Sequence, residues 1–518
     1  MKKLLALILL GAIILSLAAC GSDSGTGAGA GAARDNSEIH IGNASDVVDF
    51  SPWGGYNDFK VYYQLYDQLV TVDQDGNIQP DLAESWTVSE DGTEYTFKLR
   101  QDVVFTNGDK MTAEDVAYSI NTAIQSPNIT ALTTAWKSAE VVDDSTVKIT
   151  LDYAYNFFLQ MLSTSAGSIC NKDVVEAAGK DFSGGLAGAG TGAFKVEEYV
   201  SGSHLTYVAN EDYYKGASDI KKVVVEFISD ASTAAISLQS GSIDYTDNIN
   251  FADIAGLEEV EGLSLIKQDE LRAVYMFCNL SDENQDSPIA NPKVREAISY
   301  AVNRDDLRDY VYEGYGCTMS SFNYHTWPGY DEEPKIERDV EYAKKLMAEA
   351  GYPDGCELTL VYNSEYLMTF PDAAVLIQSQ LAEIGIDLKI NTLNQSAITE
   401  AALAGTYGDL FLHANGCFND PFSFYDYMMS SKAIGSTNHS FWSSETVDEL
   451  LVKGRTSTSD EEVAECLNQL REELWKEWPS IPLCSSGLRC AAYNGEKLTG
   501  CRVDFDFNYE IYDWKLVQ

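Results

Sequence analysis

Residues 339–362 read DVEYAKKLMAEAGYPDGCELTLVY, and this stretch decides the fold class of the chain. In its first half, apolar side chains recur at helical spacing, and Gly351 then ends the helix. The turn Pro353-Asp354-Gly355 leads into a strand over 357–362. The stretch therefore predicts a helix followed closely by a strand.

The chain continues with a second helix and a second strand. A helix is predicted over 373–384 and ends at Gly385, after which apolar residues alternate over 386–390. Two strands joined through a helix by short links pair in parallel, with the helix as the crossover. This part of the chain is therefore predicted to be α/β.

The first third of the chain has a different pattern. Residues 94–100, EYTFKLR, alternate strictly and predict a half-buried strand of a hairpin, and 147–151 predict another strand. Thr112 followed by Asp115 predicts the start of a helix. The 518 residues are enough for two or three domains, and the two patterns indicate at least two lobes.

The N-terminus has the layout of a secretory signal. A lysine pair precedes an apolar run over 4–19, which is short for a membrane span. The small residues before Cys20 resemble a lipobox, so we expect cleavage after residue 19 and a lipid on the Cys20 thiol. The following Gly/Ala/Ser/Thr-rich stretch has nothing to bury and predicts a flexible tether over 20–37.

The composition excludes several classes of protein. A formal net charge of −45 argues against nucleic-acid binding, which needs basic patches. The 45% hydrophobic and 22% charged residues are typical of a globular protein. Of the ten cysteines, those outside the lipobox are expected to be mostly buried free thiols, although Cys484, Cys490 and Cys501 could include one bridge.

Several ordered motifs resemble the signature of solute-binding protein family 5, the extracytoplasmic peptide/nickel-type component of ABC importers. They are LYDQLV at 65–70, PDLAESW at 80–86, GTGAF at 190–194, SGSID at 240–244, VREAI at 294–298 and IPL at 481–483. The resemblance covers nearly the whole mature chain. It implies an α/β, periplasmic-binding-protein-like fold (type II, cluster C-like) with two lobes, an inserted subdomain in the first lobe and a hinge of two crossings.

This resemblance places the boundaries of the predicted domains. The crossings are expected near 270–280 and 480–490. The predicted order is signal peptide 1–19, lipidated Cys20 with its tether 20–37, lobe I 38–275 with the inserted subdomain at about 75–189, lobe II 276–482, and a return to lobe I over 483–518.

Residues 413–428, HANGCFNDPFSFYDYM, are rich in aromatic residues but alternate with no clear period, so they predict an irregular segment. The family has a DYxDPxxF-type segment that faces the cleft, and in peptide-binding relatives its first Asp takes the ligand's ammonium group. Cys417 stands at that position here. The resemblance favours a pocket wall, and a loop packed into the core is the alternative. Its candidate residues are Asn415, Cys417, Phe418, Asn419 and Asp420, of which Asp420 could instead cap its own loop.

Two other places are candidates for ligand contact. The loop after the first strand, SPWGGY at 51–56, lines the cleft in relatives and offers Trp53 and Tyr56 as flat faces and Gly54-Gly55 for close backbone approach. Trp136 falls where relatives often place a ligand-facing aromatic residue. The alternative for Trp136 is a half-buried surface residue.

The predicted function is reversible capture without chemistry. The resemblance implies a substrate-binding lipoprotein that delivers a small solute, first of all an oligopeptide or dipeptide, to the permease and ATPase of an importer. An oligosaccharide or a nickel or metal chelate is the alternative ligand, and a ligand-presenting sensor subunit or a surface hydrolase is the alternative class. No HExxH or GxSxG motif is present, so no catalytic residue is predicted.

Location and partners follow from the same features. The body is expected to be a monomer on the outer face of the bacterial cytoplasmic membrane, attached through its lipid. We expect no cofactor and no metal site, because none of the five histidines forms a pair at metal-ligand spacing.

Overall fold

The structure is a computed structural model. It describes residues 37–517 except 48, 55–58, 74–76, 131, 270–271, 320, 325–326, 328–329, 331–334, 365, 368, 417–419, 458, 486 and 504–507. The predicted signal peptide, Cys20 and all of the tether except residue 37 therefore lie outside the described residues. Within the described part, no helix combines the length and the apolar character that a membrane span requires.

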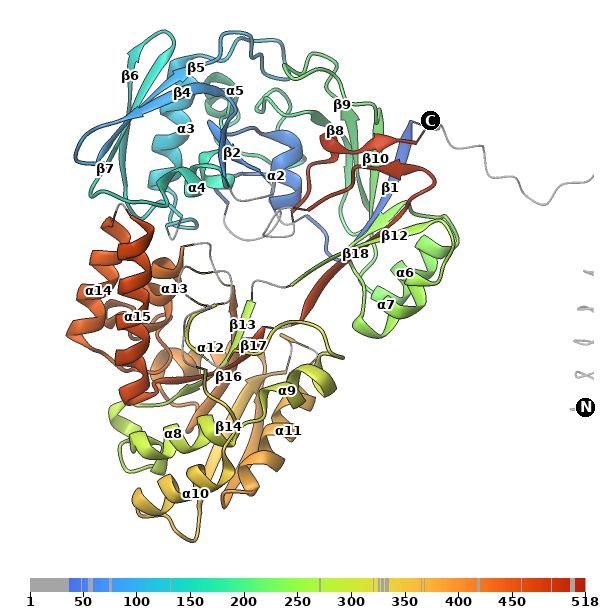
Figure 1. The fold of residues 1–518 in the computed structure, drawn as a ribbon. Coiled ribbons are helices and arrows are strands. Elements are labelled where there is room, and N and C mark those ends of the chain that lie inside the picture. Colours follow the sequence, from blue (N-terminus) through green and yellow to red (C-terminus); the bar gives the residue numbers. More distant parts are fainter. Residues whose placement is uncertain are drawn as a thin grey trace, which may run out of the picture.

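The first of two large sheets has seven strands (Figure 1). β1 pairs in parallel with β10 and β11, while β9 and β18 pair antiparallel with these neighbours. In sheet order the strands are β12 (Leu263–Asp269), β18 (Leu488–Asn494), β11 (Tyr245–Thr246), β1 (Glu38–Asn43), β10 (Lys222–Phe227), β9 (His204–Ala209) and β8 (Phe194–Val200). The helices α6 (Ala231–Gln239) and α7 (Phe251–Glu258) contact β18.

An inserted subdomain, the elements from β4 to α5, separates β1, the first strand of this sheet along the chain, from β8. It follows α2 (Phe59–Leu65) and the β2–β3 hairpin (Val70–Val72 and Ile78–Pro80). Its antiparallel sheet has the order β4 (Ala83–Val88), β5 (Glu94–Leu99), β7 (Thr146–Leu151) and β6 (Trp136–Asp143). Its helices are α3 (Ala113–Gln125), α4 (Phe158–Leu162) and α5 (Lys172–Ala177), with a 3₁₀ turn at Ser165–Gly167.

The predicted helix start at Thr112 is confirmed. The Thr112 hydroxyl accepts from the Asp115 amide at 3.3 Å, and the Asp115 carboxylate accepts from the Thr112 amide at 2.9 Å. This capping box satisfies two backbone donors that the first turn of α3 would otherwise leave without partners. The predicted strands over 94–100 and 147–151 are also confirmed, as β5 and β7.

The second large sheet has five strands and contains the strand–helix–strand unit predicted from the sequence. Its order is β15 (Ile386–Leu393), β14 (Cys356–Asn363), β16 (Leu410–Gly416), β13 (Arg272–Cys278) and β17 (Ser480–Ser485). β14 and β15 pair in parallel, as predicted, with α11 (Phe370–Ala382) as the crossover. Gly351 follows the end of α10 (Val340–Glu349) with a φ of +94°, a conformation that glycine adopts at low cost.

Helices cover both faces of the five-stranded sheet, so its strand β13 is buried on both sides. On β13, Val274 and Met276 face one apolar cluster, while Tyr275 and Phe277 face another. The remaining helices of this part are α8 (Pro292–Ala301), α9 (Arg304–Asp306), a π-helical turn (Leu307–Val311), α12 (Gln395–Ala404), α13 (Pro421–Met429), α14 (Glu445–Thr456) and α15 (Asp460–Glu477), with 3₁₀ turns at Asp282–Asn284, Pro288–Ala290 and Ser431–Ala433.

The prediction of an irregular segment over 413–428 is wrong for most of its length. The segment begins inside β16 and ends inside α13, whose N-cap is Asp420 and whose first residue is Pro421. Buried residues of α13 belong to the same apolar cluster as the neighbouring α14 and α15. Because several sides of this helix are covered, its sequence shows no helical alternation of apolar and polar residues.

The chain passes between the two large sheets twice, from β12 to β13 and from β17 to β18. We call the seven-stranded sheet with its inserted subdomain lobe I, and the five-stranded sheet with its helices lobe II (Figure 1). The last residues return to lobe I, where Trp514 packs its ring against Tyr245 at 4.6 Å between ring centroids. This C-terminal segment contains β19 (Leu498–Thr499), a 3₁₀ turn (Ile511–Asp513) and β20 (Lys515–Leu516).

The cysteines of the described residues are free thiols, as expected for most of them. No disulfide forms among Cys484, Cys490 and Cys501, so the alternative of a bridge there is not realised. Burial raises the pKa of the Cys490 and Cys501 thiols to about 12. A thiol with so high a pKa is a poor nucleophile and a poor metal ligand at neutral pH.

Candidate functional site

The strand directions point the same ends of both large sheets toward the gap between the lobes. β12 leaves lobe I in the direction of β1, β10 and β11, because β12 and β11 both pair antiparallel with β18. β13 enters lobe II antiparallel to β16, and β16 is parallel to β14. The carboxyl ends of the parallel strands in the two lobes therefore face each other. In open α/β sheets, ligands bind outside the carboxyl ends of the strands.

On the side of lobe I, the segment after β1 holds two of the predicted site residues. Trp53 is only 4% exposed, and its ring meets Phe182 edge to face at 5.8 Å between centroids. Gly54 lies where a Cβ atom would be 1.9 Å from a carboxylate oxygen of Asp49. The space beside this glycine is thus filled by Asp49. The predicted partners Gly55 and Tyr56 lie outside the described residues.

A cavity of about 410 Å³ adjoins this segment. Trp53 and Gly54 line it together with Lys180, Asp181 and other residues of the inserted subdomain and of lobe I. The Trp53 carbonyl accepts a hydrogen bond from the Ser126 hydroxyl at 2.7 Å, which ties the segment to the end of α3. Trp53 and Gly54 are therefore held between the sheet and the inserted subdomain.

The carboxyl end of β11 adds a charged group to lobe I. Asp247, next to that end, forms an ion pair with Lys60, whose ammonium also lies 5.6 Å from the centroid of the Tyr509 ring. The Asp247 side chain is 8% exposed, while the Lys60 side chain is 31% exposed. This group had no signal in the sequence, because its three residues are far apart along the chain.

On the side of lobe II, Asn415 lies at the carboxyl end of β16. It is 7% exposed, and its side-chain Nδ2 is buried with no hydrogen-bond partner in the part of the chain that the structure describes. An unpaired buried amide is costly unless a ligand or a water molecule completes it. Asn415 is thus a prepared hydrogen-bond donor next to the gap. The predicted residues Cys417, Phe418 and Asn419 lie outside the described residues.

Two histidines that are separated in the sequence, His413 and His439, pack their rings against each other. The ring centroids of His413 and His439 lie 5.7 Å apart, and His413 also stacks on Phe411 at 4.9 Å. Burial lowers the pKa of His413 to about 3, helped by His439, and lowers the pKa of His439 to about 4. Both rings are therefore neutral at physiological pH. Within the described part of the chain, no group of three or more His, Cys, Asp or Glu residues is arranged to hold a metal ion.

Asp420 is fully buried at 0% exposure and has protein partners of its own. It accepts from the Phe422 amide at 2.9 Å as the N-cap of α13, and it accepts from the Ser423 hydroxyl. The Tyr155 hydroxyl, from the inserted subdomain, donates at 2.9 Å to Oδ2 of Asp420, the same oxygen that accepts from Ser423. The capping role considered in the sequence analysis is thus observed. The Tyr155 contact joins the two lobes and had no signal in the sequence.

Trp136 lies apart from these two groups. It begins β6 in the inserted subdomain and is 3% exposed, with its ring edge to face against Phe158 at 5.6 Å. Its indole Nε1 is buried and has no hydrogen-bond partner among the described residues. The structure therefore places Trp53 and Gly54 in lobe I, Asn415 and Asp420 in lobe II, and Trp136 in the inserted subdomain.

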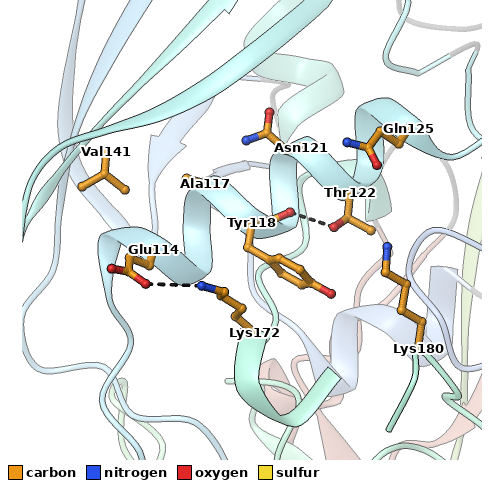
Figure 2. A pocket seen from close by; sticks show the side chains of 9 residues that line it. All are labelled: Glu114, Ala117, Tyr118, Asn121, Thr122, Gln125, Val141, Lys172 and Lys180. Atoms are coloured by element: carbon orange, nitrogen blue, oxygen red, sulfur yellow. Dashed lines mark hydrogen bonds and ion pairs between the residues drawn. The ribbon is translucent and has the colours of Figure 1, made fainter. Parts of the chain in front are cut away.

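A second cavity, of about 490 Å³, lies on the outer face of α3 (Figure 2). Its rim includes Lys172, which pairs with Glu114 at 3.4 Å, and Lys180. Tyr118 also lines the cavity. The described residues that line this cavity belong to the inserted subdomain or to the turn after it, so they place it within lobe I.

Comparison with known proteins agrees with this arrangement. The model of the family described as bacterial extracellular solute-binding proteins, family 5 Middle, matches residues 77–436. The heme-binding protein A of Haemophilus influenzae is 30% identical over 522 residues, covering 93% of this chain and 94% of that protein. The glutathione-binding protein GsiB of Salmonella typhi is 27% identical, covering 96% and 98%.

A solved structure of similar fold is the ABC transporter-associated periplasmic binding protein DppA from Helicobacter pylori, in complex with peptide STSA. It superposes with a TM-score of 0.75 at 27% identity, covering 92% of this chain and 98% of that chain. Each of these relatives is named as a binding protein.

Proposed function

Because this chain belongs to the bacterial extracellular solute-binding proteins of family 5, we propose that it captures a small solute between its lobes and delivers it to the permease and ATPase of an ABC importer. Capture would proceed by lobe closure. A ligand favours the closed form only if it touches both lobes, since a shift in equilibrium requires a difference in affinity between the two forms. A useful affinity is micromolar or better, about −8 kcal/mol.

The observation that carries this proposal is that the carboxyl ends of the parallel strands of both lobes face one gap. Asn415 supplies a buried donor there from lobe II, and Lys60 with Asp247 supplies charge from lobe I. We propose that Asn415, Asp420 and the 417–419 segment line the site, opposite the Trp53–Tyr56 segment. Trp136 stays a weaker proposal, because its ring packs on Phe158.

For the ligand we propose an oligopeptide or a dipeptide first. The relatives with peptide STSA and with glutathione in their names support a peptide-like solute, and the heme-binding relative supports a different one. An oligosaccharide and a nickel or metal chelate remain the alternatives. An interface of backbone-like donors such as Asn415 suits amide-rich ligands, because hydrogen bonds to the main chain do not depend on side-chain identity.

We also propose the remaining organisation. Residues 1–19 would be a lipoprotein signal peptide, Cys20 would carry the lipid and 20–37 would be a tether, so that a monomeric body lies on the outer face of the membrane. The predicted lobe borders at 275/276 and 482/483 fall inside β13 and β17, and we propose borders near 270 and 486 instead. The relatives are binding proteins, and we propose that this chain catalyses no reaction. A sensor role would use the same closure.

The proposal is tested by isothermal titration calorimetry with defined di- to tetrapeptides, hexose oligomers and nickel–histidine. We expect one of these classes to bind, and Asn415→Ala to weaken that binding roughly tenfold, the effect of losing one buried hydrogen bond. Asn391→Ala is the matched control, because Asn391 is exposed in the same sheet. Binding of no class, or equal affinity in both variants, would contradict the proposal.

A further inference from the structure

We propose that Tyr155 is a positioning residue for solute capture, which acts by holding the lobes together through Asp420. Its hydroxyl bonds a carboxylate of the opposite lobe directly, with no ligand between them. The pair would stabilise the closed form and so set the affinity and the release rate of whatever solute binds. This inference rests on the proposed function, but the lobe contact itself can be measured without a ligand.

The pair is the centre of a small interface between the lobes, which we call the latch. On lobe I it contains Tyr155, Asn156 and Phe157, in the link between β7 and α4. The Asn156 amide donates to the Arg455 carbonyl of lobe II at 3.3 Å. The Phe157 ring packs against the apolar clusters of both lobes. Polar and apolar contacts thus reinforce each other across the gap.

The lobe II side of the latch is firmly held. Arg455 donates twice to the Asp426 carboxylate, at 3.0 and 3.2 Å, which fixes the end of α14 against α13. Ser423 bonds both Asp420 and the Tyr155 hydroxyl, the latter at 3.1 Å. Tyr155 therefore meets a preorganised pair of acceptors, so little ordering is needed to form the contact.

The Tyr155–Asp420 pair at the centre of the latch is enclosed by protein. Tyr155 is 1% exposed and Asp420 is 0% exposed. Burial of this kind raises the pKa of the Asp420 carboxyl, and the hydrogen bonds from Ser423 and Tyr155 oppose that rise. Opening the lobes would give both groups to water and exchange a charge-assisted hydrogen bond for hydration.

The position of the latch makes it sensitive to closure. The two chain crossings lie near β13, β17 and β18, at the centre of Figure 1, whereas α13 and α4 lie beside one edge of the molecule. A rotation of one lobe about the crossings therefore separates the lobe I side of the latch from its lobe II side, while the crossings stay in place. A contact present only in the closed form raises the fraction of molecules competent to bind, and apparent affinity rises with that fraction.

The test removes one oxygen atom, that of the Tyr155 hydroxyl. Tyr155→Phe removes the bond to Asp420 but keeps the ring, and it leaves the α13 cap from Asp420 to Phe422 intact. The matched control is Tyr153→Phe, since Tyr153 is the neighbouring tyrosine, edge to face with Tyr155 at 6.3 Å, and has no contact with Asp420 among the described hydrogen bonds. Amide hydrogen exchange is measured on the ligand-free full chain in detergent, with melting temperature as the check on folding.

We expect Tyr155→Phe to speed exchange about tenfold in both 152–158 and 420–429, which lie on opposite lobes, with exchange elsewhere unchanged. Tyr153→Phe should behave as the wild type. Unchanged exchange in Tyr155→Phe, or faster exchange on one lobe only, would overturn the latch, because the second result indicates a role in local folding. The hydrogen-exchange measurement needs no ligand. If calorimetry finds no ligand, the proposed function fails while the latch can still be confirmed, so the failure of one proposal is distinguishable from the failure of the other.

Discussion

Lobe I buries carboxylates around Lys215, whereas lobe II buries arginines among backbone carbonyls. In lobe I, the Lys215 ammonium lies 2.6 Å from Asp81 and 4.0 Å from Asp67, while tyrosine hydroxyls donate to both acids. In lobe II, Arg304 donates to the Pro482 and Ser299 carbonyls at 2.9 Å. One lobe neutralises its charge with opposite charge, and the other relies on carbonyl dipoles.

Because of this difference, we expect the two lobes to respond differently to pH and to mutation. Buried acids that outnumber their cation take up protons on folding, and burial raises the pKa of Asp81 to about 6 and that of Glu510 to about 8. The buried histidines of lobe II behave oppositely, because burial lowers the pKa of His413 to about 3. The lobes should therefore lose stability at opposite ends of the pH range.

The largest effect is expected for Arg304→Met. It leaves the Pro482 and Ser299 carbonyls buried without their donor, and unpaired buried groups cost about 1–3 kcal/mol each. We expect the free energy of unfolding of lobe II to fall by about 3 kcal/mol, measured by urea unfolding. Arg308→Met is the control, since its ion pairs with Asp305 and Asp309 are partly exposed. Equal losses of unfolding free energy in both variants would contradict the conclusion that Arg304 stabilises lobe II by donating to buried carbonyls.

The matching change in lobe I is Lys215→Met. It removes the cation between Asp67 and Asp81, and we expect a loss of about 2 kcal/mol at pH 7, smaller than for Arg304 because the lysine is partly exposed and the acids can take up protons. The loss should shrink as pH falls toward 5. Lys221→Met, whose partner Glu211 is exposed, should cost little. A loss that does not change with pH would argue against proton uptake by the acids.

His413→Phe tests the expected loss of lobe II stability at acid pH. His413 has a lowered pKa in the folded state, so the unfolded chain binds more protons below about pH 6.5, and stability is lost as pH falls toward 3. The phenylalanine keeps the stacking on Phe411 but cannot take a proton. Between pH 7 and pH 5, we expect the wild type to lose about 2 kcal/mol more than the variant in urea unfolding. Parallel pH profiles would show that His413 takes up protons equally in the folded and the unfolded protein, which contradicts a lowered pKa.

Glu510→Gln tests the alkaline side. Glu510 has a raised pKa in the folded state, so its stabilising contribution is present at low pH and is lost as pH rises through about 8. We expect the wild type to lose roughly 1 kcal/mol more than the variant between pH 7 and pH 9. The measurement is the thermal unfolding midpoint at each pH. An unchanged pH profile would place the Glu510 carboxylate in contact with water.

Local signals in the sequence predicted the elements that depend on local chemistry. The Thr112 capping box and the strand over 94–100 involve neighbours in the chain, and the parallel pairing of β14 with β15 follows from short links. Helix α13 was missed because a helix covered on several sides has no polar stripe, although Asp420-Pro421 was an available start signal. As signals for a helix start, the Asp420 N-cap and Pro421 outweigh the missing periodicity of apolar residues.

The site was harder to predict than the fold, because its pairs are distant in sequence. Tyr155 and Asp420 are separated by 265 positions, and Lys60 and Asp247 by 187. His413 and His439 meet only because the loop before α14 folds back on β16. Asn415 was a candidate from the family resemblance, but the burial of its amide, with no partner among the described residues, became visible only with the fold.

The central claim is that a small solute is enclosed between the lobes, and native mass spectrometry of the gently purified protein tests it most directly. We expect a bound mass that is lost on denaturation, that fragments as a short peptide, and that is retained less by Asn415→Ala than by Asn391→Ala. A protein that carries no extra mass, and that gains none when incubated with peptides, sugars or metal chelates, would contradict the claim.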